Sequence, residues 1–128
     1  MNDQINEQLQ IIASQINFND KKRLLFIVPE SAGDIFLCTS LLPNLKIMYP
    51  DFEIYFSCYP RYQSILKNNP NITKVINYYP VMDNQIIMEG TGEWSGLFDI
   101  SIMATTLTQR IINYLHNGLS QIMFDMRN

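Results

Sequence analysis

The chain has 128 residues, of which 47% are hydrophobic and 16% charged, a balance that is typical of a folded globular protein and excludes a disordered one. This length suits one domain with its own hydrophobic core. The formal net charge of −3 gives no reason to expect a nucleic-acid partner. The basic cluster Lys21–Arg23 is interpreted as the solvated start of a strand, although a binding patch would use the same residue types.

Two cysteines, Cys38 and Cys58, do not make a disulfide framework and favour a reducing compartment. The first residues lack the charged and apolar regions of a signal peptide. No apolar run approaches the roughly 20 residues that a membrane helix needs. We therefore expect a cytoplasmic protein with no transmembrane segment.

Residues 3–17 carry an apolar stripe, with Ile5, Leu9, Ile12 and Ile16 at positions i, i+4, i+7 and i+11. This spacing predicts an amphipathic helix. Together with a linker it makes an N-terminal addition, residues 1–22, to a core domain of residues 23–128. The helix could cover a sheet edge or bind a partner, and packing against the core is the expected use.

An unbroken apolar run over residues 24–28 is typical of a parallel strand that is buried on both faces, and Pro29 ends it. We expect Gly33 to permit a tight turn, and Asp34 either to cap the following helix or to aim its carboxylate at a ligand. In open α/β sheets, ligands bind at the loops that follow the carboxyl ends of the strands. The loop of residues 30–34 is therefore the first candidate site.

The rest of the chain alternates between strand and helix signals. Short runs rich in β-branched and aromatic residues predict strands over residues 52–57, 74–77, 98–104 and 122–124. Helices are predicted over residues 35–49, 60–68 and 107–116, the first with a kink or break at Pro43. This order predicts a Rossmann-like α/β fold, with a mostly parallel sheet of about five strands and helices on both faces.

Few residues offer catalytic chemistry. The single histidine, His116, falls at a predicted helix end, where a structural cation or cap is expected. No Cys/His cluster has zinc spacing, so no metal is predicted. Three further residues keep two interpretations each: Thr39 could face the cleft or pack, Arg61 could bind an anion or stay at the surface, and Thr105 could face a ligand or cap a helix.

A series of landmarks occurs in a recognisable order. They are the strand 24–28, Ser31-Ala-Gly-Asp34, Leu41-Leu42-Pro43-Asn-Leu45-Lys46, Tyr49-Pro50, Pro60-Arg61-Tyr62, residues 69–76 and Phe98–Met103. In this order they resemble the N-terminal domain of glycosyltransferase family 9, the enzymes related to ADP-heptose:lipopolysaccharide heptosyltransferases. The resemblance covers residues 23–124 and implies the N-terminal half of a GT-B fold.

The resemblance also implies roles. Asp34 would be the general base that deprotonates an acceptor hydroxyl for an inverting sugar transfer. Acceptor-binding roles would fall on Ser31, Gly33, Thr39, Arg61 and Thr105. The glycan acceptor would bind this domain, a nucleotide-sugar donor would bind a separate domain, and neither a metal nor another cofactor is implied.

The chain departs from the family pattern in two ways. It has no donor domain, so we do not expect catalysis by the isolated chain. Glu30 precedes the serine and would repel a phosphate-bearing acceptor. The chain is thus either the acceptor domain of a fragmentary or split glycosyltransferase, or a non-catalytic binding or structural module of a larger assembly. Open sheet edges favour a donor-domain partner chain or a homo-oligomer in either case.

Overall fold

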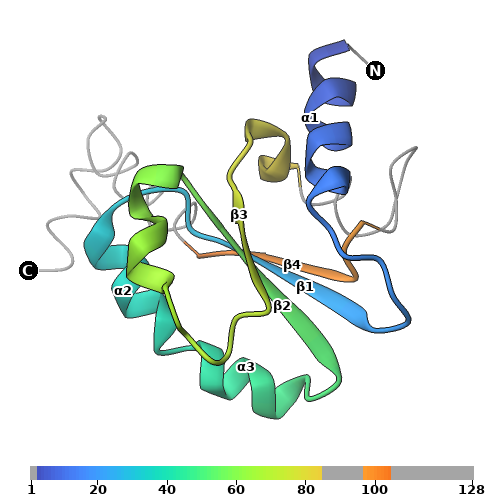
Figure 1. Ribbon diagram of the computed structural model, residues 1–128. Helices are drawn as coiled ribbons and strands as arrows, with labels where there is room; N and C mark the ends of the chain where they lie inside the picture. Colours follow the sequence, from blue (N-terminus) through green and yellow to red (C-terminus); the bar gives the residue numbers. More distant parts are fainter. Residues whose placement is uncertain (1–2, 85–96, 105–128) are drawn as a thin grey trace, which may run out of the picture.

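The computed structural model describes residues 3–84 and 97–104. In chain order its elements are α1 (Asp3–Ser14), β1 (Lys22–Ile27), α2 (Ala32–Thr39), α3 (Leu42–Met48), β2 (Phe52–Cys58), the 3₁₀ helix η1 (Pro60–Leu66), β3 (Lys74–Asn77), the 3₁₀ helix η2 (Pro80–Asp83) and β4 (Ile100–Met103) (Figure 1).

The four described strands form one parallel sheet in the order β3-β2-β1-β4. This is the order of the first four strands in a doubly wound Rossmann sheet. The central strand β1 pairs Lys22 with Phe52 of β2, and Leu24 with Ile100 of β4. The predicted α/β class and parallel sheet are confirmed. The predicted strand 122–124 and helix 107–116 lie outside the described residues.

Strand β1 is buried on both faces, as its apolar run predicted, because helices cover the sheet on each side. Alternate side chains of a strand point to opposite faces. Leu25 and Ile27 therefore enter one hydrophobic cluster, and Leu24, Phe26 and Val28 enter another.

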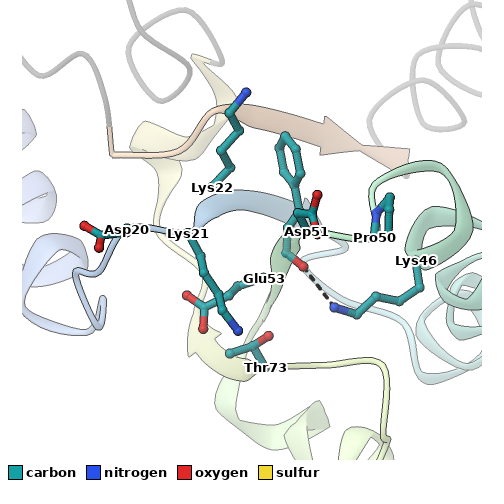
Figure 2. A pocket seen from close by; sticks show the side chains of 9 residues that line it. Asp20, Lys21, Lys22, Lys46, Pro50, Asp51, Glu53 and Thr73 are labelled. Atoms are coloured by element: carbon teal, nitrogen blue, oxygen red, sulfur yellow. Dashed lines mark hydrogen bonds between the residues drawn. The ribbon is translucent and has the colours of Figure 1, made fainter.

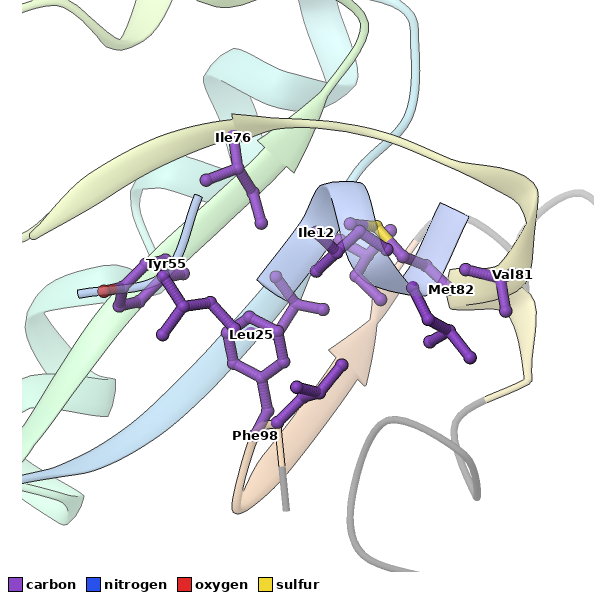
Figure 3. Close-up of a cluster of buried hydrophobic side chains, with 11 residues drawn as sticks. Ile12, Leu25, Tyr55, Ile76, Val81, Met82 and Phe98 are labelled. Atoms are coloured by element: carbon purple, nitrogen blue, oxygen red, sulfur yellow. The ribbon is translucent and has the colours of Figure 1, made fainter. Parts of the chain in front are cut away.

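Helix α1 covers the first of these faces. Leu9 and Ile12 are fully buried and pack in a cluster with Leu25, Tyr55 and Phe98 (Figure 3). Burying one such aliphatic side chain contributes about 1.5–3 kcal/mol. The predicted amphipathic helix is confirmed, and its apolar stripe serves core packing.

Polar contacts add to this packing and fix where α1 lies along the sheet. The amide of Val81 in η2 donates to the side-chain oxygen of Gln8 at 3.0 Å, and the amide of Asn17 donates to the Tyr55 hydroxyl at 3.0 Å. The N-terminal helix is therefore joined to η2, and the segment that follows it is joined to β2.

Helices α2, α3 and η1 cover the opposite face through Ile35, Leu42, Leu45 and Leu66. The break predicted near Pro43 is confirmed: α2 ends at Thr39, and α3 starts at Leu42 with the proline in its first turn. Proline fits there because amides of a first turn have no intrahelical acceptor. The helix predicted from Pro60 is a 3₁₀ helix that ends at Leu66.

Arg23 corrects one expectation. Its side chain is only 7% exposed, so the cluster of residues 21–23 is not solvated throughout. The Nε atom of Arg23 donates to the Leu97 carbonyl at 3.0 Å, and its backbone amide donates to a carboxylate oxygen of Asp99 at 2.8 Å. Arg23 thus anchors the segment that leads into β4, whereas Lys21 and Lys22 are exposed as expected.

Within residues 3–84 and 97–104, no helix combines the length and apolar character required to cross a membrane.

Candidate functional site

The carboxyl edge of the sheet brings three loops together. Backbone pairing continues past the strand ends: the amide of Tyr59 donates to the Pro29 carbonyl at 2.9 Å, and the amide of Tyr78 donates to the Cys58 carbonyl at 3.1 Å. The residues that follow β1, β2 and β3 are therefore held side by side at the edge where open α/β sheets bind ligands.

A cavity of about 430 Å³ opens at this edge and is lined by Glu30, Tyr59, Pro60 and Arg61. We call it the carboxyl-edge cavity. An Oε2 atom of Glu30 lies 3.7 Å from Nη2 of Arg61, so an ion pair crosses from the loop after β1 to the start of η1. The guanidinium carbon of Arg61 also lies 5.7 Å from the ring centre of Tyr59 and 5.0 Å from that of Tyr62. A volume of this size suits a small ligand.

Tyr78 and Asp83 support this cavity from behind Tyr59. The rings of Tyr59 and Tyr78 meet edge to face, with their centres 5.2 Å apart. The Tyr78 hydroxyl donates to Oδ1 of Asp83 at 2.7 Å. Burial, this hydrogen bond and the negative charges of Asp83 and Glu30 raise the pKa of Tyr78 well above its ordinary value. Tyr78 therefore keeps its proton further into the alkaline range than an ordinary tyrosine does, and it remains a donor to Asp83.

The loop from β1 into α2 differs from its prediction in two respects. Ser31, not Asp34, occupies the N-cap position of α2, and its side chain makes no capping hydrogen bond. The unusual backbone conformation also belongs to Ser31, with φ 78° and ψ 105°, whereas Gly33 lies inside the helix. Side-chain-bearing residues rarely adopt a φ of this kind, and such strain is often found at functional sites.

Gly33 is not needed by the fold around it. A Cβ atom added there would meet no atom within 4 Å, and the residue is exposed. Neither packing nor a left-handed backbone therefore accounts for the glycine. Close approach of an outside molecule to the backbone is one property that glycine would preserve here.

Asp34 lies in the first turn of α2, where the helix dipole favours a negative charge. Its side chain is exposed, and none of the residues 3–84 and 97–104 donates a hydrogen bond to its carboxylate. Burial, together with the Asp34 charge, raises the pKa of the Cys38 thiol one turn further on. An exposed carboxylate of this kind is free to accept a proton from a bound hydroxyl.

Not all of the other residues predicted to bind an acceptor lie at the carboxyl-edge cavity. Arg61 lines the carboxyl-edge cavity, and Ser31 directly follows its wall residue Glu30. The Thr39 hydroxyl donates to the Phe36 carbonyl at 2.5 Å, so it is bonded within its own helix at the far end of α2. Thr105 lies outside the described residues.

Three residues of this edge were missed by the sequence analysis, namely Tyr59, Tyr78 and Asp83. A signal for the first two was available, because each directly follows the last residue of a strand in a parallel sheet. The pairing of Glu30 with Arg61 had no such signal, since it depends on how β1 and β2 align.

A larger cavity, of about 670 Å³, lies at the opposite, amino edge of the sheet (Figure 2). Its charged residues are of both signs, and several are engaged: Nζ of Lys46 donates to the Phe52 carbonyl at 2.9 Å, and Glu53 accepts from Asn19 at 3.0 Å. This edge is not the one where parallel sheets present their ligand-binding loops. We assign these residues to holding the strand beginnings in place.

In the described part of the chain, no group of three or more His, Cys, Asp or Glu residues could hold a metal ion. No family model matches the chain, and neither the curated proteins nor the solved structures compared with it include a match. The family resemblance therefore rests on the landmarks of the chain itself.

Proposed function

We propose that this chain is the acceptor-binding domain of a glycosyltransferase related to glycosyltransferase family 9, with Asp34 as the general base. The observation that carries the proposal is the position of Asp34. Its exposed carboxylate lies at the carboxyl edge of a parallel sheet, four residues after Glu30 in the wall of the carboxyl-edge cavity.

In this mechanism the acceptor occupies the carboxyl-edge cavity with one hydroxyl directed at Asp34. The carboxylate takes the proton of that hydroxyl while its oxygen attacks the anomeric carbon of a nucleotide-sugar. The bond from that carbon to the nucleotide diphosphate breaks on the opposite face, which inverts the configuration. The nucleotide leaves with the bonding electrons, and the proton stays on Asp34.

The donor would be held by a partner chain that carries the second domain. Leu37 and Leu41 follow Asp34 by three and seven residues and are 66% and 46% exposed. Leu37 lies on the same side of α2 as Asp34, because residues three apart on a helix are neighbours, whereas Leu41 lies in the turn between α2 and α3. Exposed leucines on α2 and directly after it favour a protein surface that covers them when the cleft is assembled.

The proposal is tested by sugar transfer with a candidate donor-domain chain, comparing wild type with Asp34→Asn. Loss of a general base lowers turnover by about 10²–10⁴-fold, so we expect a decrease in that range. Asp51→Asn removes a carboxylate at the opposite edge of the sheet and should leave transfer unchanged. Unchanged turnover in Asp34→Asn would remove this residue from the mechanism.

A second function, a non-catalytic binding or structural module in a larger assembly, is favoured by one observation. No described residue orients the Asp34 carboxylate, whereas catalytic bases are normally held in place by a neighbouring group. The two functions separate when the assembly is isolated. If the chain is a non-catalytic module, the assembly should form equally well with the wild type and with Asp34→Asn. It should transfer no sugar with either of these two proteins.

A further inference from the structure

The charges around the carboxyl-edge cavity are unusual for a site that would take a phosphorylated ligand. Glu30 is in its wall, Asp34 follows in α2, and Asp83 is bonded to Tyr78 behind Tyr59. Of the residues that line the cavity, Arg61 alone is cationic. Among the described residues that line the cavity, one carboxylate therefore faces one cation, and the further carboxylates of Asp34 and Asp83 lie on the segments that follow β1 and β3.

Arg61 is also engaged in ways that weaken it as an anion site. Glu30 lies 3.7 Å from the guanidinium group and offsets its charge. The same group lies over the rings of Tyr59 and Tyr62. An incoming phosphate would have to displace the Glu30 carboxylate from Arg61, and like charges disfavour each other.

The remaining chemistry suits a sugar ring. The C–H groups of a pyranose carry small positive charges that are attracted to the negative face of an aromatic ring. Tyr59 and Pro60 supply an apolar wall, and the edge-to-face contact with Tyr78 fixes the position of Tyr59. The carboxylate of Glu30 accepts hydrogen bonds from hydroxyl groups, and the guanidinium group of Arg61 donates to their oxygens.

We infer that the carboxyl-edge cavity binds an uncharged sugar ring and rejects phosphorylated sugars. The inference rests on the proposed function for its ligand class, the glycan acceptor. It adds that Glu30 is the specificity-determining residue, because its carboxylate both neutralises Arg61 and opposes an anionic ligand. The ligand is recognised by Tyr59 through its ring and by Arg61 through its hydroxyl oxygens.

Saturation-transfer NMR on the purified full chain tests this with matched probes. These are the methyl glycosides of glucose, galactose and mannose, and the 6-phosphate of each. We expect at least one uncharged glycoside to bind in the millimolar range, and its phosphate to bind at least about fivefold more weakly. Tyr59→Leu should weaken glycoside binding about fivefold, since it keeps an apolar wall but removes the ring.

Glu30→Gln is the decisive variant. It leaves Arg61 without its counter-charge, so the phosphorylated sugar should bind at least about fivefold more tightly than to wild type, and more so at low salt. Asp51→Asn is the matched control and should change neither affinity. Both side chains of the ion pair are exposed, so the folded state is retained, which circular dichroism checks.

Tighter binding of the phosphate than of the glycoside to wild type overturns the inference, as does binding of none of the three glycosides. These results are distinguishable from failure of the proposed function. Glycoside binding without any Asp34-dependent transfer would overturn the enzyme and leave the cavity's specificity standing. Asp34-dependent transfer to a phosphorylated acceptor would support the proposed enzyme and overturn the inferred specificity of the cavity.

Discussion

The Glu30 carboxylate and the Arg61 guanidinium group are 3.7 Å apart and join the loop after β1 to the start of η1. The side chains remain 48% and 68% exposed, respectively. Exposed ion pairs typically contribute about 0–1 kcal/mol to stability. The pair therefore sets the charge of the carboxyl-edge cavity far more than it stabilises the fold.

Arg61→Ala and Glu30→Gln should each change the free energy of unfolding by less than about 1 kcal/mol. Urea denaturation at low and high salt measures this change. The double variant should differ from the sum of the single changes by less than about 1 kcal/mol. A loss of several kcal/mol in either single variant would show that the pair supports the fold.

Gly33→Ala should stabilise the chain. The added methyl group meets no atom within 4 Å, and alanine is favoured over glycine inside a helix by about 1 kcal/mol. Thermal unfolding should show a rise in Tm. If a ligand approaches the backbone at Gly33, the added methyl group should also weaken ligand binding. We therefore expect Gly33→Ala to raise the Tm and lower the ligand affinity.

Ser31→Gly should also stabilise the chain, because φ 78° strains a serine and not a glycine. Relief of such strain is worth about 1 kcal/mol or more. Ser40→Gly is the control, since Ser40 has an ordinary helical φ of −67° and should lose stability. Equal effects of the two substitutions in chemical denaturation would contradict the strain at Ser31.

Leu9→Ala and Ile12→Ala should each lower the free energy of unfolding by about 2–5 kcal/mol, because both side chains are fully buried against the sheet. Ile11, on the same helix, is 36% exposed, so Ile11→Ala should cost clearly less. Denaturant midpoints measure the three values. Similar small losses at all three positions would show that α1 is not part of the core.

Alkaline pH should destabilise the fold through Cys58. Burial raises the pKa of this thiol from 9.0 to about 11, so the folded state holds its proton more tightly than the unfolded state does. The stability that this gives is complete below pH 9 and is lost as the pH rises from about 9 to about 11.

The matched variant is Cys58→Ala, which should be less stable at every pH but lose less stability between pH 8 and pH 10. Comparison of urea midpoints at the two pH values isolates this slope. The upper limit is set at pH 10 because tyrosines of the unfolded chain, whose ordinary pKa is 10.0, are already half ionised there. Equal slopes in the two proteins would exclude Cys58 as the titrating group.

The sequence was most informative where one local signal decided the structure. The strand Lys74–Asn77 has the predicted bounds because a turn and a proline flank a short apolar run. The break near Pro43 followed from the missing amide of proline. In both cases the physical cause acts within a few residues.

Prediction was weaker where tertiary contacts decide. Nothing local to Ser31 indicates its positive φ, so the sequence predicts the turn at Gly33 and offers Asp34 as one candidate for the cap. Arg23 is buried because Leu97 and Asp99 provide acceptors more than 70 residues away. Arg61 was a candidate from the sequence, but its partner Glu30 and its neighbour Tyr59 depend on the alignment of β1 with β2.

The two faces of the sheet draw their fully buried residues from different lengths of chain, and this gives folding a direction. The buried residues of the α2–α3 face run from Leu24 to Leu66, and the region of β4 adds only the partly buried Ile100, Ile102 and Ala104, whereas the buried residues of the α1 face run from Leu9 to Phe98. Contacts between residues distant in sequence form more slowly, because a longer loop must close first. On a ribosome, α1 would therefore emerge first and dock late, after β4 has been made.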